Sequence, residues 1–326
     1  MAVPRIVSLL PSATEIAVAV GQAAELVGRS HECDFPEQVR GLPVCTATKL
    51  DKGLTSRAID DRVKEIVRQG LSVYEVDADL LRRLRPDVIL TQSQCAVCAV
   101  TPADLEATLA SWIGAPPVLL SLSPDTLDDV WGDLRRVGEA VGASTAADIA
   151  VVELKDRLGQ LSERAARRGH RPRVAAVEWI DPLMMAGNWV PELISAAGGE
   201  PLFVAPGEHS PWFDWEAFVA ADPDIIVTMP CGYGIAQTLA DIGGLTGRPG
   251  WRDLSAVRAG RVYVTDGHHY FNRPGPRLVD SAEIIFEIVG DAYGEIAAPS
   301  SRWVKIDDYG ADTAPASSPV TFEGRS

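Results

Sequence analysis

The sequence lacks an apolar run long enough to cross a membrane, since no hydrophobic stretch reaches the eighteen or so residues that a span needs. Its first residues, Met1-Ala2-Val3-Pro4, show no basic segment, no apolar segment and no small-residue cleavage site of an export signal. We therefore expect no membrane insertion. We also expect a cytoplasmic protein, or a periplasmic one if an export signal has been removed.

Positive charge is also scarce, because 30 basic residues stand against 45 acidic ones and give a net charge of −15. Nucleic acids and anionic membranes both attract basic surfaces, so neither is expected as a partner. The five cysteines are an odd number without the spacing of a disulfide scaffold, which predicts reduced thiols. The loop Cys231-Gly232-Tyr233-Gly234 lacks the lysine of a phosphate loop, and no nucleotide is expected.

What the sequence does contain is a long helical stretch in its middle, over residues 123–169. Ser123 is suited to cap its start and Pro124 to its first position. Gly142 marks a weak point, after which the second part alone would span about 35 Å. Apolar residues recur at steps of three and four: Leu127, Val130, Trp131, Leu134, Val137 and Val141, then Val151, Leu154, Leu158, Leu161 and Ala165. This pattern predicts a rigid strut between two lobes.

Strand and helix patterns alternate on both sides of this stretch, and 326 residues suit two lobes. We expect an N-terminal α/β lobe over 1–122, the linking backbone helix over 123–169, a C-terminal α/β lobe over 170–296 and a flexible tail over 297–326. The Pro-Asp pairs 86–87 and 223–224 each precede a buried strand that leads into a cysteine-bearing loop. Ligands bind at the carboxyl ends of parallel strands, so both loops should face one cleft.

Several short motifs together resemble the cobalamin-binding proteins of ABC importers, over about residues 4 to 290. They are Ser8-Leu9-Leu10-Pro11-Ser12-Ala13-Thr14-Glu15, Val27-Gly28-Arg29-Ser30, Asp34-Phe35-Pro36, Leu84-Arg85-Pro86-Asp87-Val88-Ile89, Pro211-Trp212 and Phe271-Asn272-Arg273-Pro274-Gly275-Pro276-Arg277. The resemblance implies two Rossmann-like α/β lobes joined by a long rigid helix, the type III substrate-binding architecture. It also implies a corrinoid held between the lobes without chemistry on it, so that the chain is not an enzyme.

The resemblance further implies roles for individual residues. Trp212 and the Tyr270-Phe271 turn match positions that line the cleft of the family. Asp104 and Glu216 lie near the acidic residues through which such proteins dock on a permease, although both also suit plain solvated helix carboxylates. A permease is expected only if the chain is exported. The segment from 49 to 74 departs from the family, because it inserts a helix into the first lobe.

The loop His31-Glu32-Cys33-Asp34 places four metal-type side chains in a row. Consecutive residues cannot all reach one ion, but two could, and the imidazole could also coordinate the cobalt of a corrinoid. Alternatively, the carboxylates cap a turn and the histidine bonds to the backbone. Cys95-x-x-Cys98 fits half a zinc site, a redox pair or two small buried thiols. The candidate metal ligands are His31, Cys33, Cys95 and Cys98, and the metal is left open.

The remaining candidates follow strand ends or open helices. Glycines beside Tyr233 allow close approach to a ligand, and Arg277 suits a carboxylate or an amide. Two adjacent histidines rarely both bind, so we expect one of His268 and His269 to be structural. The candidate ligand-binding residues are Ser12, Thr14, His31, Glu32, Cys33, Asp34, Cys95, Trp189, Trp212, Cys231, Tyr233, His268, Tyr270, Phe271 and Arg277.

Two other functions fit the same pattern. One is a siderophore, haem or metal-ion receptor. The other is a cytosolic enzyme with Cys33 as nucleophile and His31 or Glu32 as base, which would require a depressed pKa of the Cys33 thiol. Adjacent loop side chains point apart, which disfavours the enzyme.

Overall fold

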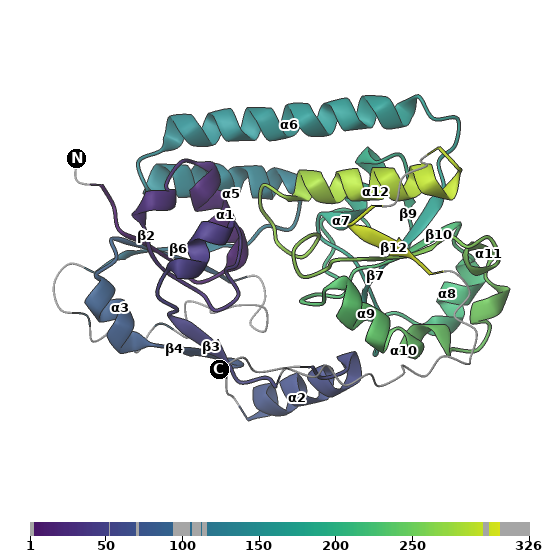
Figure 1. Ribbon diagram of the computed structural model, residues 1–326, viewed down its shortest axis with the longest axis horizontal. Helices are drawn as coiled ribbons and strands as arrows, with labels where there is room; N and C mark the ends of the chain where they lie inside the picture. Colours follow the sequence, from purple (N-terminus) through teal and green to yellow (C-terminus); the bar gives the residue numbers. More distant parts are fainter. Residues whose placement is uncertain are drawn as a thin grey trace, which may run out of the picture.

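Two mostly parallel β-sheets, one in each half of the chain, lie side by side along a pair of long helices (Figure 1). The computed structural model describes residues 3–51, 53–69, 72–93, 105, 112, 116–295 and 300–306. The predicted fold class, α/β with two Rossmann-like lobes and a long connecting helix, is confirmed. Within the described ranges, no helix combines the length and apolar character that crossing a membrane requires.

The N-terminal lobe is built on a four-stranded parallel sheet in the order β2-β1-β5-β6. Its strands are β1 (Ile6–Ser8), β2 (Leu26–Arg29), β5 (Val88–Gln92) and β6 (Val118–Leu122). Around them lie α1 (Pro11–Ala19), η1 (Ala23–Glu25), η2 (Glu37–Gly41), α3 (Ala78–Leu84) and the antiparallel pair β3 (Thr46–Thr48) and β4 (Tyr74–Val76). Ile6 and Val7 enter different apolar clusters, because successive side chains point to opposite faces of a sheet.

The C-terminal lobe has a six-stranded sheet in the order β12-β11-β10-β7-β8, with β9 also paired to β7. Its strands are β7 (Arg173–Trp179), β8 (Met184–Met185), β9 (Glu200–Pro201), β10 (Ile225–Thr228), β11 (Val262–Thr265) and β12 (Trp303–Lys305). Its helices are α7 (Val190–Ala196), α8 (Trp215–Ala221), α9 (Ile235–Asp241), α10 (Gly243–Thr246), η3 (Trp251–Asp253), α11 (Ser255–Arg258) and α12 (Leu278–Ala292).

The two lobes repeat one local design, as the paired Pro-Asp sequences indicate. Arg85 and Asp222 end α3 and α8 in the same left-handed conformation. Two residues further on, the Asp87 carboxylate accepts a bond of 2.7 Å from the backbone N–H of Arg5, before β1. Asp224 accepts the equivalent bond of 2.8 Å from Arg173, at the start of β7. Each carboxylate thus fixes the start of two adjacent parallel strands.

The connecting stretch is two helices rather than one, α5 (Leu127–Ala140) and α6 (Ser144–Ala166). The chain reverses between them at Gly142, whose φ of +73° is a conformation that glycine adopts readily. The first helix begins later than predicted, because Thr126 and Asp129 form a capping box there instead of Ser123 and Pro124. The 23 residues of α6 then extend about 35 Å across both lobes (Figure 1).

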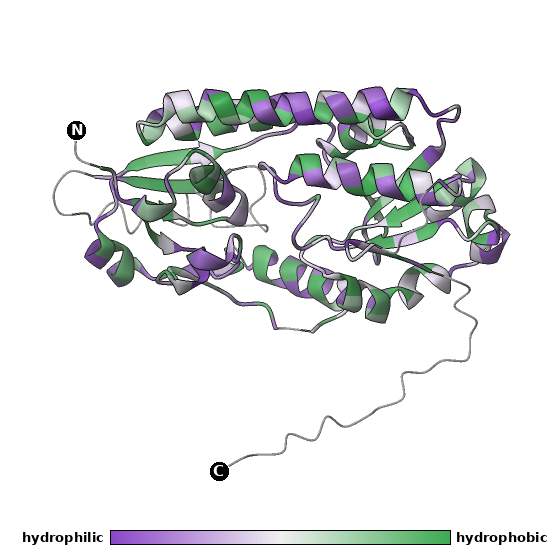
Figure 2. Ribbon diagram, turned by 45° about the horizontal axis from the view of Figure 1, so that its top comes forward, coloured by the Kyte–Doolittle hydropathy of each residue, from purple (hydrophilic) through white to green (hydrophobic). Residues whose placement is uncertain are grey.

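Close packing joins α5 and α6 into one antiparallel unit. An ion pair links Arg135 to Asp148 at 2.9 Å. A Cβ atom on Gly138 would lie only 2.4 Å from the Cβ of Ala147. The apolar side chains of both helices belong to a cluster that continues into α1, α7 and α12. Figure 2 shows hydrophobic strands in the N-terminal lobe and mixed hydropathy along α6, as expected of a helix with one buried face.

Part of the segment expected to be a flexible tail instead completes the second sheet. Residues 303–305 form β12, antiparallel to β11. The Trp303 ring packs edge-on against Tyr263 at 5.3 Å, and its indole N–H donates to Glu287 at 3.2 Å. Burial of the apolar Trp303 ring therefore holds this segment in the sheet, although the residues around it are mostly polar.

The inserted helix α2 (Ser56–Arg68) forms a second connection, on the side of the molecule opposite α6 (Figure 1). The backbone N–H of Ser56 donates to Asp241 at 2.9 Å, and Arg57 pairs with Asp181. The Tyr233 hydroxyl of the C-terminal lobe donates to the carbonyl of Leu54 at 2.9 Å. The space between the lobes is therefore bordered by α5 and α6 on one side and by α2 on the other.

The contact at Gly138 provides a test of the α5–α6 unit. We expect Gly138→Ala to lower the free energy of unfolding by about 1–3 kcal/mol, because the added methyl group overlaps Ala147. Gly132→Ala in the same helix is the matched control, since its added Cβ would meet no atom within 4 Å and alanine favours helix. Urea denaturation followed by circular dichroism measures both, and equal effects would contradict the packing described.

Candidate functional site

The loops at the carboxyl ends of parallel strands from both lobes converge between the lobes. In the N-terminal lobe these are the loops after β1 and β2, and in the C-terminal lobe those after β10 and β11. This is the edge at which open α/β sheets bind ligands. The predicted common cleft therefore corresponds to a real meeting of the two lobes.

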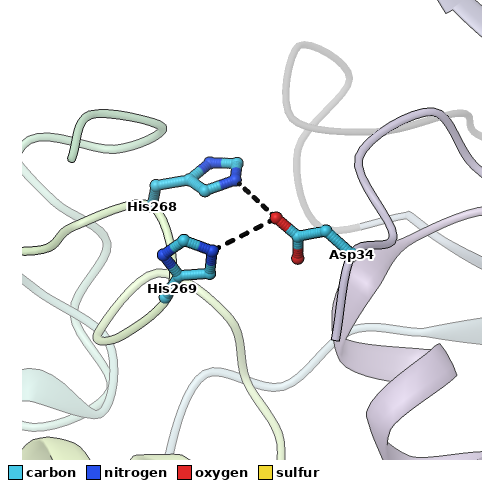
Figure 3. A group of neighbouring side chains, drawn as sticks. All are labelled: Asp34, His268 and His269. Carbon is cyan, nitrogen blue, oxygen red and sulfur yellow. Dashed lines mark hydrogen bonds and ion pairs between the residues drawn. The ribbon is translucent and has the colours of Figure 1, made fainter. Parts of the chain in front are cut away.

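Asp34, in the loop after β2, lies at the centre of this meeting (Figure 3). Its Oδ2 atom is 3.0 Å from His268 Nε2 and 3.2 Å from His269 Nε2, both in the loop after β11. Its Oδ1 atom accepts a bond of 2.6 Å from Arg273. Burial tends to raise the pKa of Asp34, but the bonds from His268, His269 and Arg273 outweigh it and lower the pKa well below its usual range.

Asp266, directly after β11, holds both histidines in place. Its Oδ1 atom accepts bonds from the backbone N–H groups of His268 and His269, at 3.0 and 2.9 Å. Its Oδ2 atom lies 2.7 Å from His269 Nδ1. The bonds to Asp266 and Asp34 raise the pKa of His269 to about 9. Gly267 lets this loop approach the one after β10, because a Cβ there would lie 2.2 Å from the carbonyl oxygen of Pro230.

The expectation that only one of the two histidines binds a ligand stays a prediction, because both rings make the same contact in the structure. Both Nε2 atoms lie within hydrogen-bond distance of the same oxygen of Asp34. The two rings meet edge to face with centroids 4.6 Å apart, which lets neighbouring residues aim at one point.

A buried ion pair crosses the lobe boundary beside Asp34. Glu15 of α1 is only 4% exposed and accepts two bonds from Arg277, at 2.8 and 2.5 Å. Arg273 approaches the same carboxylate at 3.4 Å. Ser12 and Glu15 have the spacing of a capping box, but α1 begins without a side-chain cap. Glu15 instead neutralises two arginines of the other lobe.

The loop from 31 to 34 divides its side chains between different partners. His31 Nδ1 lies 2.8 Å from the Thr46 hydroxyl. Cys33 is fully buried, and its sulfur accepts a bond of 3.0 Å from Thr14. Burial raises the pKa of the Cys33 thiol to about 11 and also raises that of the Glu32 carboxyl. The depressed thiol pKa that an enzyme based on Cys33 requires is therefore the reverse of what the structure shows.

Further acidic groups from the C-terminal lobe face this loop. Glu178, at the end of β7, accepts a bond of 2.9 Å from Ser210, and burial raises its pKa to about 7. Burial, with the charges of Glu178 and Glu32, raises the pKa of the Cys231 thiol to about 12. Cys33, Cys45 and Cys231 are free thiols, as the cysteine count predicts.

The predicted aromatic residues separate into exposed and core positions. Trp212 is 56% exposed, and the ammonium group of Lys64 in α2 lies 5.7 Å from its ring. Tyr270 is partly exposed beside Arg277. Trp189 and Phe271 belong to the apolar core, where the indole N–H of Trp189 donates to the Phe271 carbonyl at 2.6 Å. Trp212 and Tyr270 thus remain as aromatic side chains available to a ligand.

Other predicted residues lie away from the central contacts or outside the described ranges. Ser12 is buried at the start of α1, and Tyr233 is buried against Trp179. Glu216 is exposed in the first turn of α8. Cys95, Cys98 and Asp104 lie outside the residues that the structure describes. Consequently, a metal site combining Cys95 and Cys98 with His31 and Cys33 stays a prediction.

Four residues of the site carried no assigned role in the sequence analysis: Glu15, Phe35, Asp266 and Arg273. Phe35 is 43% exposed and lies under the Arg277 guanidinium at 4.0 Å. Acidic and arginine side chains are common, and the partners of Glu15 and Arg273 lie more than 230 residues away along the chain. Asp266 bonds to the nearby His268 and His269, but its role depends on their contact with the distant Asp34. The sequence signal that could have identified them is their position within or beside the motifs of the first lobe and of the turn before α12.

The chain is similar to known proteins in both its sequence and its fold. The pattern of the family described as periplasmic binding protein matches residues 6–268. The vitamin B12-binding protein of Vibrio cholerae is 24% identical over 280 residues, covering 86% of each chain. A crystal structure of that species' periplasmic vitamin B12-binding protein BtuF is 21% identical, covers 89% of this chain and 98% of its own, and has a TM-score of 0.63.

Two further relatives are similar over comparable lengths. The uncharacterized ABC transporter substrate-binding lipoprotein YvrC of Bacillus subtilis is 24% identical over 292 residues, 87% of this chain and 79% of its own length. A periplasmic haem-binding protein from Pseudomonas aeruginosa is 20% identical, covers 94% of this chain and 98% of its own, and has a TM-score of 0.67.

The two-lobed fold is the type III architecture of solute-binding proteins. The chain belongs to the periplasmic binding protein family. Proteins of this family bind small molecules for ABC permeases without transforming them, so the prediction that the chain is not an enzyme is confirmed. The relatives are a lipoprotein and periplasmic proteins, and they give no support to the cytoplasmic location expected above.

The buried pair between Glu15 and Arg277 gives a prediction about stability. We expect Arg277→Met to lower the free energy of unfolding by about 3–5 kcal/mol, because Glu15 would stay buried with only the longer contact to Arg273. Arg57→Met is the matched control, since it also breaks a pair between lobes but on an exposed surface where water screens the charges. Urea unfolding midpoints compare them, and similar losses for both variants would refute this role of Glu15.

Proposed function

We propose that the chain binds a corrinoid between its lobes. The observation that carries this proposal is the acidic lining of the site, where Glu32, Asp34 and Glu178 face the meeting of the lobes. The periphery of a corrinoid carries neutral amide groups, and their N–H bonds are donors that carboxylates and thiols accept. The vitamin B12-binding relative, which covers 86% of this chain, supports the same ligand class.

The charges also argue against haem, which brings carboxylates of its own. Arg273 and Arg277 are already engaged by Glu15 and Asp34. The carboxylates of a haem would therefore compete with Glu15 and Asp34 for these arginines. They would also be repelled by the like charge of Glu32. The same argument disfavours an anionic siderophore complex, although the haem-binding relative keeps these ligands as the alternative.

Aromatic side chains at the border of the site support contact with a flat macrocycle. Trp212 exposes more than half of its surface beside α2, and Tyr270 is accessible next to the exposed ring of Phe35. Faces of this kind pack against extended conjugated rings. His31 would be the candidate axial ligand of the cobalt, with Thr46 holding its other ring nitrogen.

A titration distinguishes these ligands. We expect hydroxocobalamin to bind near one per chain with micromolar or tighter affinity, and haem to bind at least tenfold more weakly. Trp212→Ala should weaken hydroxocobalamin binding by about tenfold, equivalent to about 1.4 kcal/mol, because a stacking face is lost. Tyr293→Ala removes an exposed aromatic ring at the end of α12 and serves as the control. Calorimetry measures the affinities, and the visible spectrum of His31→Ala reports cobalt coordination.

The reverse order of affinities, with haem bound tightly and hydroxocobalamin not at all, would contradict the corrinoid proposal. An effect of Tyr293→Ala equal to that of Trp212→Ala would contradict the placement of the ligand.

For delivery to a permease we propose Glu216 and Asp104 as the docking carboxylates, one on each lobe. Glu216 supports this proposal by its exposure in the first turn of α8. We expect Glu216→Lys to bind hydroxocobalamin like the unmodified chain but to stimulate the ATPase of its permease less, because the charge is reversed. Lys305→Glu, a charge reversal on β12, is the control. Unchanged stimulation by Glu216→Lys would exclude this residue.

A further inference from the structure

Three side chains at the lobe boundary present metal-type ligand atoms to one point (Figure 3). The Oδ2 atom of Asp34 and the Nε2 atoms of His268 and His269 all lie within 4.8 Å of one another. We propose that these residues bind a divalent transition-metal ion of the zinc class, which links the two lobes. The inference goes beyond the proposed corrinoid binding and does not depend on it.

The hydrogen bonds of His269 indicate which of its ring atoms is available. Nδ1 lies 2.7 Å from a carboxylate oxygen of Asp266, and a carboxylate can only accept, so Nδ1 carries a proton. Nε2 faces Asp34 Oδ2 at 3.2 Å, where it either donates a second proton to that oxygen or, once the proton is displaced, offers its lone pair to a metal ion between the two atoms. A carboxylate behind a histidine is also the usual support of a metal-ligating imidazole.

The contacts of His268 also favour a metal ion, because its Nε2 atom faces both an acceptor and a donor. Its Nε2 atom lies 3.0 Å from Asp34 Oδ2, an acceptor, and 3.0 Å from Arg273 Nη2, a donor. One nitrogen cannot satisfy both contacts, because it either carries a proton or accepts one. A metal ion beside Oδ2 would use the nitrogen lone pair and remove the repulsion from the carboxylate, while Arg273 keeps its bond of 2.6 Å to Oδ1.

The distances and charges of the site suit such an ion. Ligand bonds of 2.0–2.1 Å in a tetrahedral zinc site place ligand atoms about 3.3 Å apart, and the two Asp34–histidine distances here are 3.0 and 3.2 Å. The carboxylates of Glu15, Asp34 and Asp266 lie nearby, and the Glu32 carboxyl interacts electrostatically with His268, Arg273 and Asp34; the guanidinium groups of Arg273 and Arg277 oppose them. Metal binding displaces the proton of His269, and with both imidazoles neutral these four carboxylates exceed the two guanidinium groups by two negative charges, which a divalent cation balances.

The proposed ligands come from both lobes, so binding of the ion depends on how the lobes are arranged. Asp34 comes from the N-terminal lobe and both histidines from the C-terminal lobe. A complete set of three therefore exists only when the lobes are together. Three protein ligands also leave a position for water or for a donor atom of a bound solute, as in open metal sites.

Calorimetric titration of the metal-stripped full chain with Zn²⁺ tests the proposal, with no corrinoid present. We expect about one ion per chain with a dissociation constant of 10 µM or tighter. Replacing a ligand, as in His269→Gln or Asp34→Asn, should weaken binding at least a hundredfold. Asp266→Asn, which changes the group that supports both histidines but removes no ligand, should weaken it about 10–100-fold. His209→Gln alters an exposed histidine outside the site and should bind like the unmodified chain.

A second readout on the unmodified chain guards against variants that fail to fold. Zn²⁺ should protect His268 and His269 from modification by diethyl pyrocarbonate, measured by peptide mass spectrometry, and leave His209 unprotected. Binding weaker than 100 µM, equal affinities of His269→Gln and His209→Gln, or no protection of the histidine pair would each overturn the metal site. The hydroxocobalamin titration is also to be run on metal-stripped protein, so that failure of one proposal is distinguishable from failure of the other.

Discussion

The arrangement of the molecule depends on buried charges that cross from one lobe to the other. Glu15 and Asp34 on the N-terminal lobe meet Arg273 and Arg277 on the C-terminal lobe; Glu15 and both arginines are buried, and Asp34 is partly exposed. An isolated charge at such a depth costs several kcal/mol, so neither lobe surface is stable in this form without the other. The network therefore specifies how the lobes face each other, whereas the apolar core through α5, α6, α7 and α12 provides most of the packed apolar side chains.

Topology explains why this charged boundary is also the place where we propose that the ligand binds. All strands of the first sheet are parallel, as are β7, β10 and β11, so their carboxyl ends lie at one edge of each lobe. The helices α5 and α6 hold those edges opposite one another, and α2 borders the same space on the far side. A solute between the lobes thus meets loops rather than regular structure. Loops can carry carboxylates, histidines and aromatic rings without disturbing the strands beneath them.

Local patterns predicted the fold well because they report local physics. The stripe from Leu127 to Val141 is buried as expected, and the repeated Pro-Asp sequences do occupy equivalent positions in the two lobes. Errors arose where a distant partner decided the outcome. Glu15 has the spacing of a helix cap but pairs with Arg277, and Trp303 lies in a polar segment but packs on Tyr263. Trp189 has loop neighbours that suggest exposure, yet its indole reaches the core through Phe271.

By itself the sequence determined the two α/β lobes, the helical connection and the set of polar loops, because periodicity, turn residues and strand ends act over a few positions. Only the tertiary structure decided which polar residues meet. Asp34 and His269 are 235 positions apart, and no spacing rule joins them. The tertiary structure also buries Cys33 beside Thr14, where its thiol has no contact with solvent. Proximity between lobes depends on how the whole helical layer orients them, which is a property of the packed chain.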